Sequence, residues 1–295
     1  MTSKTAQTPK ISVEFFPPKQ IEHFNELITV ADELQQINPS LYTITYGAGG
    51  STQIMTQSLV ERFMARYSLD IASHLTCIGM SEESLKSLLN HYKNMGLSHL
   101  VVLRGDLPER SILAQKNQVF HYAKDLLLWI KSQYGSQFKI TVAAYPEYHP
   151  ECQQPDKEFH YLIDKLKAGA DQAFTQYFFN PDAYFYLTDR LKKSGVDTPV
   201  IPGIMPITNF NSIVRFSKKC GVDIPRWIYF KLNEYEHDPA SLKAFGYEVT
   251  LRLCRQLLEQ RVPGLHFYCL NKHSPIKELV SDLSLNDKLC TSVIS

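Results

Sequence analysis

The sequence predicts a single-domain α/β protein of the (β/α)8 (TIM) barrel class, and three observations support this prediction. Eight short runs rich in β-branched and aromatic residues recur at intervals of roughly thirty residues. Each run is followed by apolar residues at helical spacing, and strictly alternating strands and helices are typical of a parallel sheet. The glycine fingerprint G-x-G-x-x-G of an open dinucleotide-binding sheet does not occur, which favours the closed barrel.

The first predicted strand contains a carboxylate that needs an explanation. Glu14 lies in the middle of an apolar run, and Pro17 and Pro18 end that run because proline cannot donate to a strand ladder. Glutamate is seldom buried without a partner or a task, so Glu14 either faces water from an edge strand or belongs to a site. A closed barrel has no edge strand, which favours the site. The eight strands are predicted at residues 11–16, 42–47, 71–77, 99–105, 139–146, 172–179, 200–206 and 264–271.

Amphipathic helices are predicted between the strands, because apolar residues recur there at i, i+3 and i+4. Two such stripes consist of Phe24, Leu27, Ile28, Ala31 and Leu34, and of Leu85, Leu88, Leu89 and Tyr92. Ser81 is a suitable cap for one helix, and Asn180 followed by Pro181 is a suitable start for another. Helix ends are expected at three glycines, Gly96, Gly169 and Gly195.

The composition is that of an ordinary globular protein. With 295 residues, of which 44% are hydrophobic, the chain can bury a sizeable core. We expect a flexible segment over residues 1–10 and one catalytic domain over residues 11–295. A helical insertion is expected around residues 207–262, including a helix over residues 242–259.

The net charge and the cysteine pattern argue against several classes of partner and site. The net charge is +1 and no run of lysine or arginine occurs, so neither nucleic acid nor an acidic membrane is expected as a partner. No signal peptide or bilayer-spanning stretch is evident, and a cytoplasmic location is the default expectation. The six cysteines form no C-x-x-C pair, so neither a metal site nor a disulfide framework is predicted.

Polar residues gather at the carboxyl ends of the predicted strands, where the chemistry of a barrel enzyme takes place. They are Glu14, Thr45, Tyr46, His74, Thr76, Arg104, Gly105, Asp106, Tyr145, Glu147, Tyr148, His149, Gln176, Asn271 and Lys272. Singly, each has a structural alternative: His74 could be a core histidine, and Arg104 with Asp106 a surface ion pair. No G-x-S-x-G or H-E-x-x-H motif occurs. Isolated carboxylates, hydrogen-bond donors and aromatic side chains are instead suited to binding an organic cofactor.

Eight motifs together resemble the bacterial-type methylenetetrahydrofolate reductase family. They are EFFPPK (14–19), TYGAGG (45–50), HLTC (74–77), LRGD (103–106), AAYPE (143–147), TQ (175–176), IPGI (201–204) and HFY (266–268). The resemblance implies a (β/α)8 barrel that binds FAD without a Rossmann domain. It also implies an oxidoreductase in which NADH or NADPH reduces FAD, which then passes hydride to 5,10-methylenetetrahydrofolate. The product would be 5-methyltetrahydrofolate, in one-carbon metabolism and methionine supply.

The resemblance also implies roles for individual residues. Glu14 would be the proton donor, a task that suits a pKa raised by apolar surroundings. Asp106 would lie beside the flavin and the pterin as a second catalytic residue, Thr45 near the dinucleotide substrate, and Gln176 against folate and nicotinamide in turn. The implied FAD contacts are Thr45, Tyr46, Ala48, His74, Arg104, Gly105, Asp106, Tyr122, Ala123, Tyr145, His149, Glu158, Tyr161 and Lys165. The implied folate contacts are Glu14, Asp106, Gln176, Ser212, Phe216, Leu270 and Lys272.

The chain departs from the family pattern at three positions. Asp164 replaces a basic residue of some members, Ser212 stands where glutamine is common, and Lys272 where arginine is common. Because lysine lacks the bidentate fork of arginine, we expect the folate tail to be held differently or less tightly.

Several questions stay open at the level of sequence. A homo-oligomer is expected, although the number of copies and the choice between NADH and NADPH are not determined. One alternative is a Schiff-base lyase or aldolase, for which Lys272 is the only lysine at the carboxyl end of a predicted strand. The other alternative is a non-catalytic pterin-binding protein.

Overall fold

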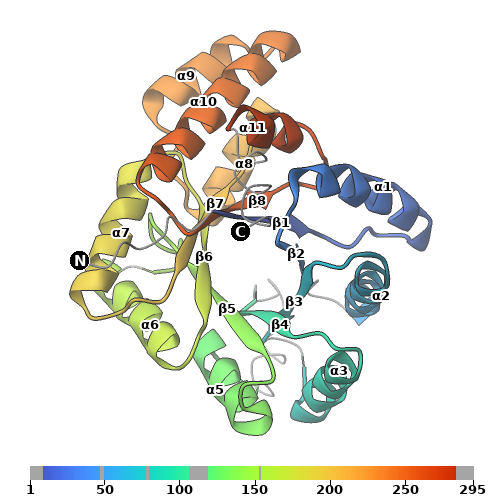
Figure 1. Ribbon diagram of the computed structural model, residues 1–295. Helices are drawn as coiled ribbons and strands as arrows, with labels where there is room; N and C mark the ends of the chain where they lie inside the picture. The colour runs from blue at the N-terminus through green and yellow to red at the C-terminus, as the bar shows by residue number, and fades with distance from the viewer. Residues whose placement is uncertain (1–8, 47–49, 78–79, 106–118, 153, 284–295) are drawn as a thin grey trace, which may run out of the picture.

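The chain forms a closed barrel of eight parallel strands surrounded by helices (Figure 1). The computed structural model describes residues 9–46, 50–77, 80–105, 119–152 and 154–283. In chain order the strands are β1 (Lys10–Phe15), β2 (Leu41–Ile44), β3 (Asp70–Thr76), β4 (His99–Leu103), β5 (Lys139–Ala144), β6 (Gln172–Tyr177), β7 (Val200–Ile204) and β8 (Gly264–Tyr268). Each strand pairs with its neighbours in sequence, and β1 pairs with β8. The prediction of a (β/α)8 barrel is confirmed.

The first strand is an internal member of the closed sheet. Glu14 stands opposite Thr43 on β2 and Tyr268 on β8, so both sides of the strand are paired. The edge-strand interpretation of Glu14 is therefore wrong. Most strands also end two or three residues earlier than predicted, which places residues such as Thr45 in the loops above the barrel.

The helices pack apolar stripes against the outside of the barrel. They are α1 (Phe24–Leu34), α2 (Gly50–Arg66), α3 (Glu82–Asn94), α5 (Ala123–Tyr134), α6 (Pro155–Lys167), α7 (Pro181–Lys193), α8 (Phe210–Cys220), α9 (Arg226–Glu234), α10 (Pro239–Glu259) and α11 (Ile276–Asp282), with short 3-10 turns at Ile21–His23 and Gln35–Ile37. Ser81 caps α3 by accepting a hydrogen bond from the Ser84 backbone N–H, and Asn180 caps α7 in the same way. The glycines at the predicted helix ends all have positive φ: Gly96, Gly169 and Gly195.

The segment between β7 and β8 contains three helices, where a regular β/α unit has one. The predicted helix at residues 242–259 lies within α10. Buried residues of α8, α9 and α10 form an apolar cluster with Tyr177 and Met205, which lie at the carboxyl ends of β6 and β7. In Figure 1 α9 and α10 lie at the outer edge of the molecule, beyond α8. The insertion thus builds one wall of the barrel mouth.

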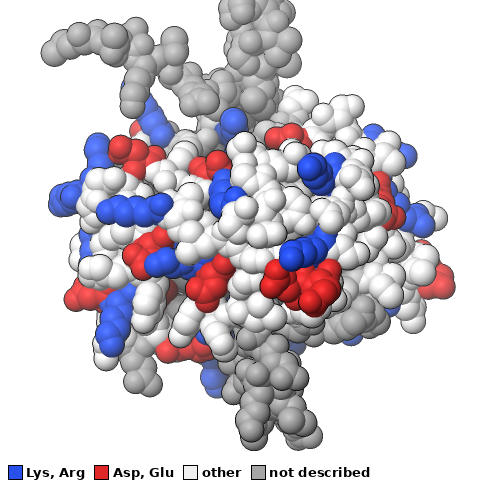
Figure 2. Space-filling view, turned by 90° about the horizontal axis from the view of Figure 1, so that it is seen from below, with Lys and Arg blue, Asp and Glu red and all other residues white. Residues whose placement is uncertain are grey.

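The surface carries charges of both signs. On the face shown in Figure 2, lysine and arginine side chains alternate with aspartate and glutamate, and neither sign forms a continuous field. No helix among the described residues has the length and apolar character needed to cross a lipid bilayer.

Candidate active site

Two adjoining cavities open at the carboxyl end of the barrel. The first, here called the central cavity, has a volume of about 460 Å³ and lies over the strand ends. The second, the outer cavity, has a volume of about 580 Å³ and is bounded by β4, β5 and helices α5, α6 and α7. Both cavities are lined by Leu103, Gly105, Ala143 and Tyr145, so they lie next to each other.

Glu14 projects into the central cavity between two histidine rings. Its Oε2 atom lies 3.4 Å from Nε2 of His74 and 3.6 Å from Nε2 of His266, and its side chain is 20% exposed. Neither Nε2 atom has a hydrogen-bond partner among the described residues. The His266 ring is fixed by a 2.8 Å contact between its Nδ1 and Ser12 Oγ and by stacking on Phe174 at 3.9 Å.

These neighbours control the protonation of Glu14. Burial raises the pKa of Glu14, but the contact with His266 and the proximity of His74 outweigh burial and hold the pKa below its ordinary value. Burial also lowers the pKa of His74 to about 4. An apolar strand alone would raise the pKa of Glu14, and the two histidines that face its carboxylate oppose that rise.

The remaining walls of the central cavity are amide, hydroxyl and apolar groups. Gln176, Phe216 and Leu270 line this cavity as expected for a folate site, together with Thr45 and Tyr46. The carboxyl ends of β1 and β8 are joined above it by the side chain of Asn271. That side chain accepts a hydrogen bond from the Phe16 N–H at 3.1 Å and donates one to the Phe16 carbonyl at 2.8 Å.

Two of the predicted site residues line neither cavity, and two others have no described position. Ser212 lies in the first turn of α8, and Lys272 is exposed beyond β8; neither lines a cavity. Lys272 was the lysine required by the Schiff-base alternative, which therefore loses its candidate. Ala48 and Asp106 lie outside the described residues.

Most of the residues expected to contact FAD line the outer cavity. It is lined by Arg104, Gly105, Tyr122, Ala123, Tyr145, His149, Glu158, Tyr161 and Lys165. The other expected FAD residues with a described position, Thr45, Tyr46 and His74, line the central cavity. The predicted cofactor set thus extends along both cavities.

Lys165 is the clearest sign of an anionic ligand in the outer cavity. Its Nζ atom donates to the backbone carbonyl of Ala143 at 2.6 Å, and burial lowers the pKa of its ammonium group to about 8. A partly buried ammonium group held by a neutral carbonyl is well suited to bind a phosphate. Tyr122 and Tyr161, 63% and 60% exposed, supply aromatic surface nearby. The residues present therefore fit an elongated ligand that carries both phosphate and aromatic rings.

Backbone geometry requires a glycine where the two cavities meet. Gly105 has a φ of +88°, and a Cβ at this position would lie 3.0 Å from Thr76 Cβ. Glu158 accepts hydrogen bonds from the His149 N–H at 2.8 Å, which fixes the loop after β5.

Sequence reasoning missed several residues of the site. His266 belongs to a quoted motif but received no role, and Lys124 directly follows a predicted contact, Ala123. Tyr186 and Arg190 of α7 also line the outer cavity. No sequence pattern marks Tyr186 or Arg190 as a site residue, because only the packing of α7 against α6 brings them to the cavity.

Comparisons with known proteins agree with this geometry. A family model described as methylenetetrahydrofolate reductase matches residues 1–284. The 5,10-methylenetetrahydrofolate reductase of Buchnera aphidicola subsp. Schizaphis graminum is 36% identical over 265 residues, covering 90% of this chain and 88% of that protein. Methylenetetrahydrofolate reductase (NADH) 1 of Arabidopsis thaliana is 32% identical over 287 residues, covering 94% of this chain and 48% of that protein.

A solved structure shares the fold at lower identity. An uncharacterized protein from Clostridium thermocellum, described as binding two copies of 5-methyl-5,6,7,8-tetrahydrofolic acid, superposes with a TM-score of 0.64 at 15% identity, covering 96% of each chain. At this identity the likeness supports only the barrel fold. The family model and the sequence relatives cover most of the chain, and those relatives are more similar in sequence. This chain belongs to the methylenetetrahydrofolate reductase family.

Proposed function

We propose that this protein uses bound FAD to reduce 5,10-methylenetetrahydrofolate to 5-methyltetrahydrofolate, with NADH or NADPH as the hydride donor. The observation that carries the proposal is the pair of adjoining cavities. One contains the partly buried ammonium group of Lys165, and the other contains the carboxylate of Glu14 beside an apolar wall.

The outer cavity would hold the phosphate and adenine parts of FAD. Lys165 and Arg104 would bind the diphosphate, and Tyr122 and Tyr161 would pack against the adenine ring. Bound FAD accepts hydride from a nicotinamide and donates hydride to an electron-poor carbon. The flavin ring would lie where the cavities meet, beside the backbone of Gly105.

Glu14 would supply a proton to the folate. Reduction of the methylene bridge requires cleavage of one carbon–nitrogen bond, and a proton on the departing N10 nitrogen makes that cleavage easier. The hydride then adds to the methylene carbon, which stays on N5 as the new methyl group. Because Glu14 has a lowered pKa, it has to gain its proton before this step. A bound pterin would exclude water, and the added desolvation would shift the Glu14 pKa upward.

A ping-pong order is supported by the size of the central cavity. Gln176, Phe216 and Leu270 line one space of about 460 Å³, in which a nicotinamide and a pterin would compete for the same flavin face. The plant relative is named for NADH, and we extend that preference to this protein as part of the proposal.

The test is a pair of anaerobic half-reactions. Purified protein loaded with FAD should lose its flavin absorbance on mixing with NADH. Adding 5,10-methylenetetrahydrofolate should then restore the absorbance and yield 5-methyltetrahydrofolate. A protein that cannot be loaded with FAD, or a reduced flavin that methylenetetrahydrofolate does not reoxidise, would contradict the proposal.

A further inference from the structure

We propose that two carboxylates of the outer cavity, Glu151 and Asp164, compete with the phosphate groups of the cofactor for Arg104 and Lys124. On this account FAD binds by exchanging two ion pairs within the protein for ion pairs with its diphosphate. The inference rests on the proposed FAD-dependent function and names residues that limit cofactor affinity.

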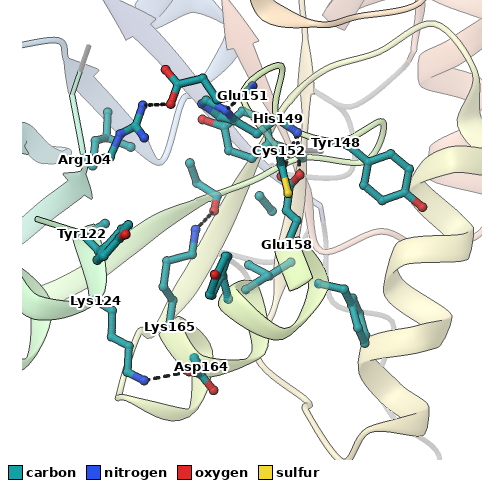
Figure 3. A pocket seen from close by; sticks show the side chains of 18 of the residues that line it. Arg104, Tyr122, Lys124, Tyr148, His149, Glu151, Cys152, Glu158, Asp164 and Lys165 are labelled. Atoms are coloured by element: carbon teal, nitrogen blue, oxygen red, sulfur yellow. Dashed lines mark hydrogen bonds and ion pairs between the residues drawn. The ribbon is translucent and has the colours of Figure 1, made fainter. Parts of the chain in front are cut away.

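The two ion pairs lie on the walls of the cavity (Figure 3). An Arg104 guanidinium nitrogen lies 2.7 Å from a carboxylate oxygen of Glu151, and Lys124 Nζ lies 2.7 Å from a carboxylate oxygen of Asp164. All four side chains line the outer cavity. Each pair is partly exposed to solvent, and exposed pairs of this kind are worth at most about 1 kcal/mol. Both pairs can therefore open at little cost when a stronger anion arrives.

The other cavity cations have different partners. Lys165 donates to a backbone carbonyl and needs no exchange before it binds phosphate. Arg190 pairs with Asp156, which does not line the cavity, and lies 3.9 Å over the ring of Phe159. Lys165 would thus be a constant anchor, while Arg104 and Lys124 become available only after their carboxylates move away.

The charge balance of the described lining explains why the exchange matters. Four cationic side chains face four carboxylates: Arg104, Lys124, Lys165 and Arg190 against Asp125, Glu151, Glu158 and Asp164. Two of these carboxylates bind backbone N–H groups, Asp125 that of Tyr122 and Glu158 that of His149. Glu151 and Asp164 have cavity cations as their ion-pair partners instead. They are thus the carboxylates whose charge opposes an incoming diphosphate most directly.

Neutral variants test the proposal. Glu151→Gln and Asp164→Asn keep the shape of each side chain and remove its charge. The FAD dissociation constant of the FAD-free protein, measured by quenching of flavin fluorescence, should fall about three- to tenfold in each variant. The gain should shrink at high salt, because screening weakens both the competing pair and the phosphate contact.

A matched control separates this effect from a general change of charge. Glu61 pairs with His91 at 2.9 Å and lines neither cavity, so Glu61→Gln should leave the FAD dissociation constant unchanged. Unchanged or weaker FAD binding in Glu151→Gln and Asp164→Asn would overturn the inference while leaving the proposed function intact. A wild-type protein that binds no FAD would overturn both.

Discussion

Replacing Lys165 with methionine should stabilise the FAD-free protein and weaken its binding of FAD. The lysine side chain carries its ammonium group into the outer cavity, where the Ala143 carbonyl accepts its hydrogen bond. Methionine keeps the apolar stem of lysine and removes the charge. The two effects have opposite signs, which separates a binding residue from a structural one.

The size of the stability change follows from the pKa of Lys165. A fall of this pKa from 10.5 to about 8 corresponds to a cost of about 3 kcal/mol for keeping the ammonium charged in the folded protein. Loss of the hydrogen bond to Ala143 offsets about 1 kcal/mol. The FAD-free variant should therefore be more stable than wild type by about 2 kcal/mol at pH 7. Loss of a charged contact should weaken FAD binding by about ten- to a hundredfold.

The pH dependence gives a stricter test. Because the folded pKa lies below the unfolded one, the cost is fully present below pH 8 and is relieved as pH rises toward 10.5. Urea unfolding should show the advantage of Lys165→Met shrinking over that interval. Lys167→Met, an exposed change on the same helix, is the control and should change neither property. A variant less stable than wild type, or an advantage independent of pH, would show that the charge of Lys165 does not destabilise the FAD-free protein.

Three further changes test the surrounding structure. Burial raises the pKa of Glu147 to about 7, so Glu147→Gln should exceed wild type in stability by about 1 kcal/mol above pH 7, with no difference in thermal melts near pH 4.5. Gly203→Ala should cost about 3 kcal/mol in urea unfolding, because a Cβ would collide with the Thr175 carbonyl. Asn271→Ala removes both bonds to Phe16 and should cost about 2 kcal/mol in urea unfolding.

Each of these changes has a result that would contradict it. For Glu147→Gln, the contradicting result is a stability difference that does not vary with pH. For Gly203→Ala, it is a variant as stable as wild type. For Asn271→Ala it is a variant that unfolds at the same urea concentration as wild type.

Local signals predicted the fold and the location of the site. Strand runs, helical stripes and caps such as Ser81 depend on neighbours within a few residues, and the barrel topology brings all strand ends to one mouth. The protonation of Glu14 could not be predicted, because it depends on a ring held by partners far apart in sequence: Ser12 and His266 are 254 residues apart. The ion pair between Lys124 and Asp164 spans 40 residues and joins two helices, so no local pattern reveals it.

A comparison of the two half-reactions in Glu14→Gln tests most directly whether Glu14 is the proton donor. If Glu14 gives its proton to the folate, NADH should bleach the flavin of the variant at the wild-type rate. Reoxidation by 5,10-methylenetetrahydrofolate should be slowed at least about a hundredfold, the usual minimum contribution of a general acid. Equal loss of both half-reactions, or reoxidation at the wild-type rate, would contradict the role of Glu14 as the proton donor.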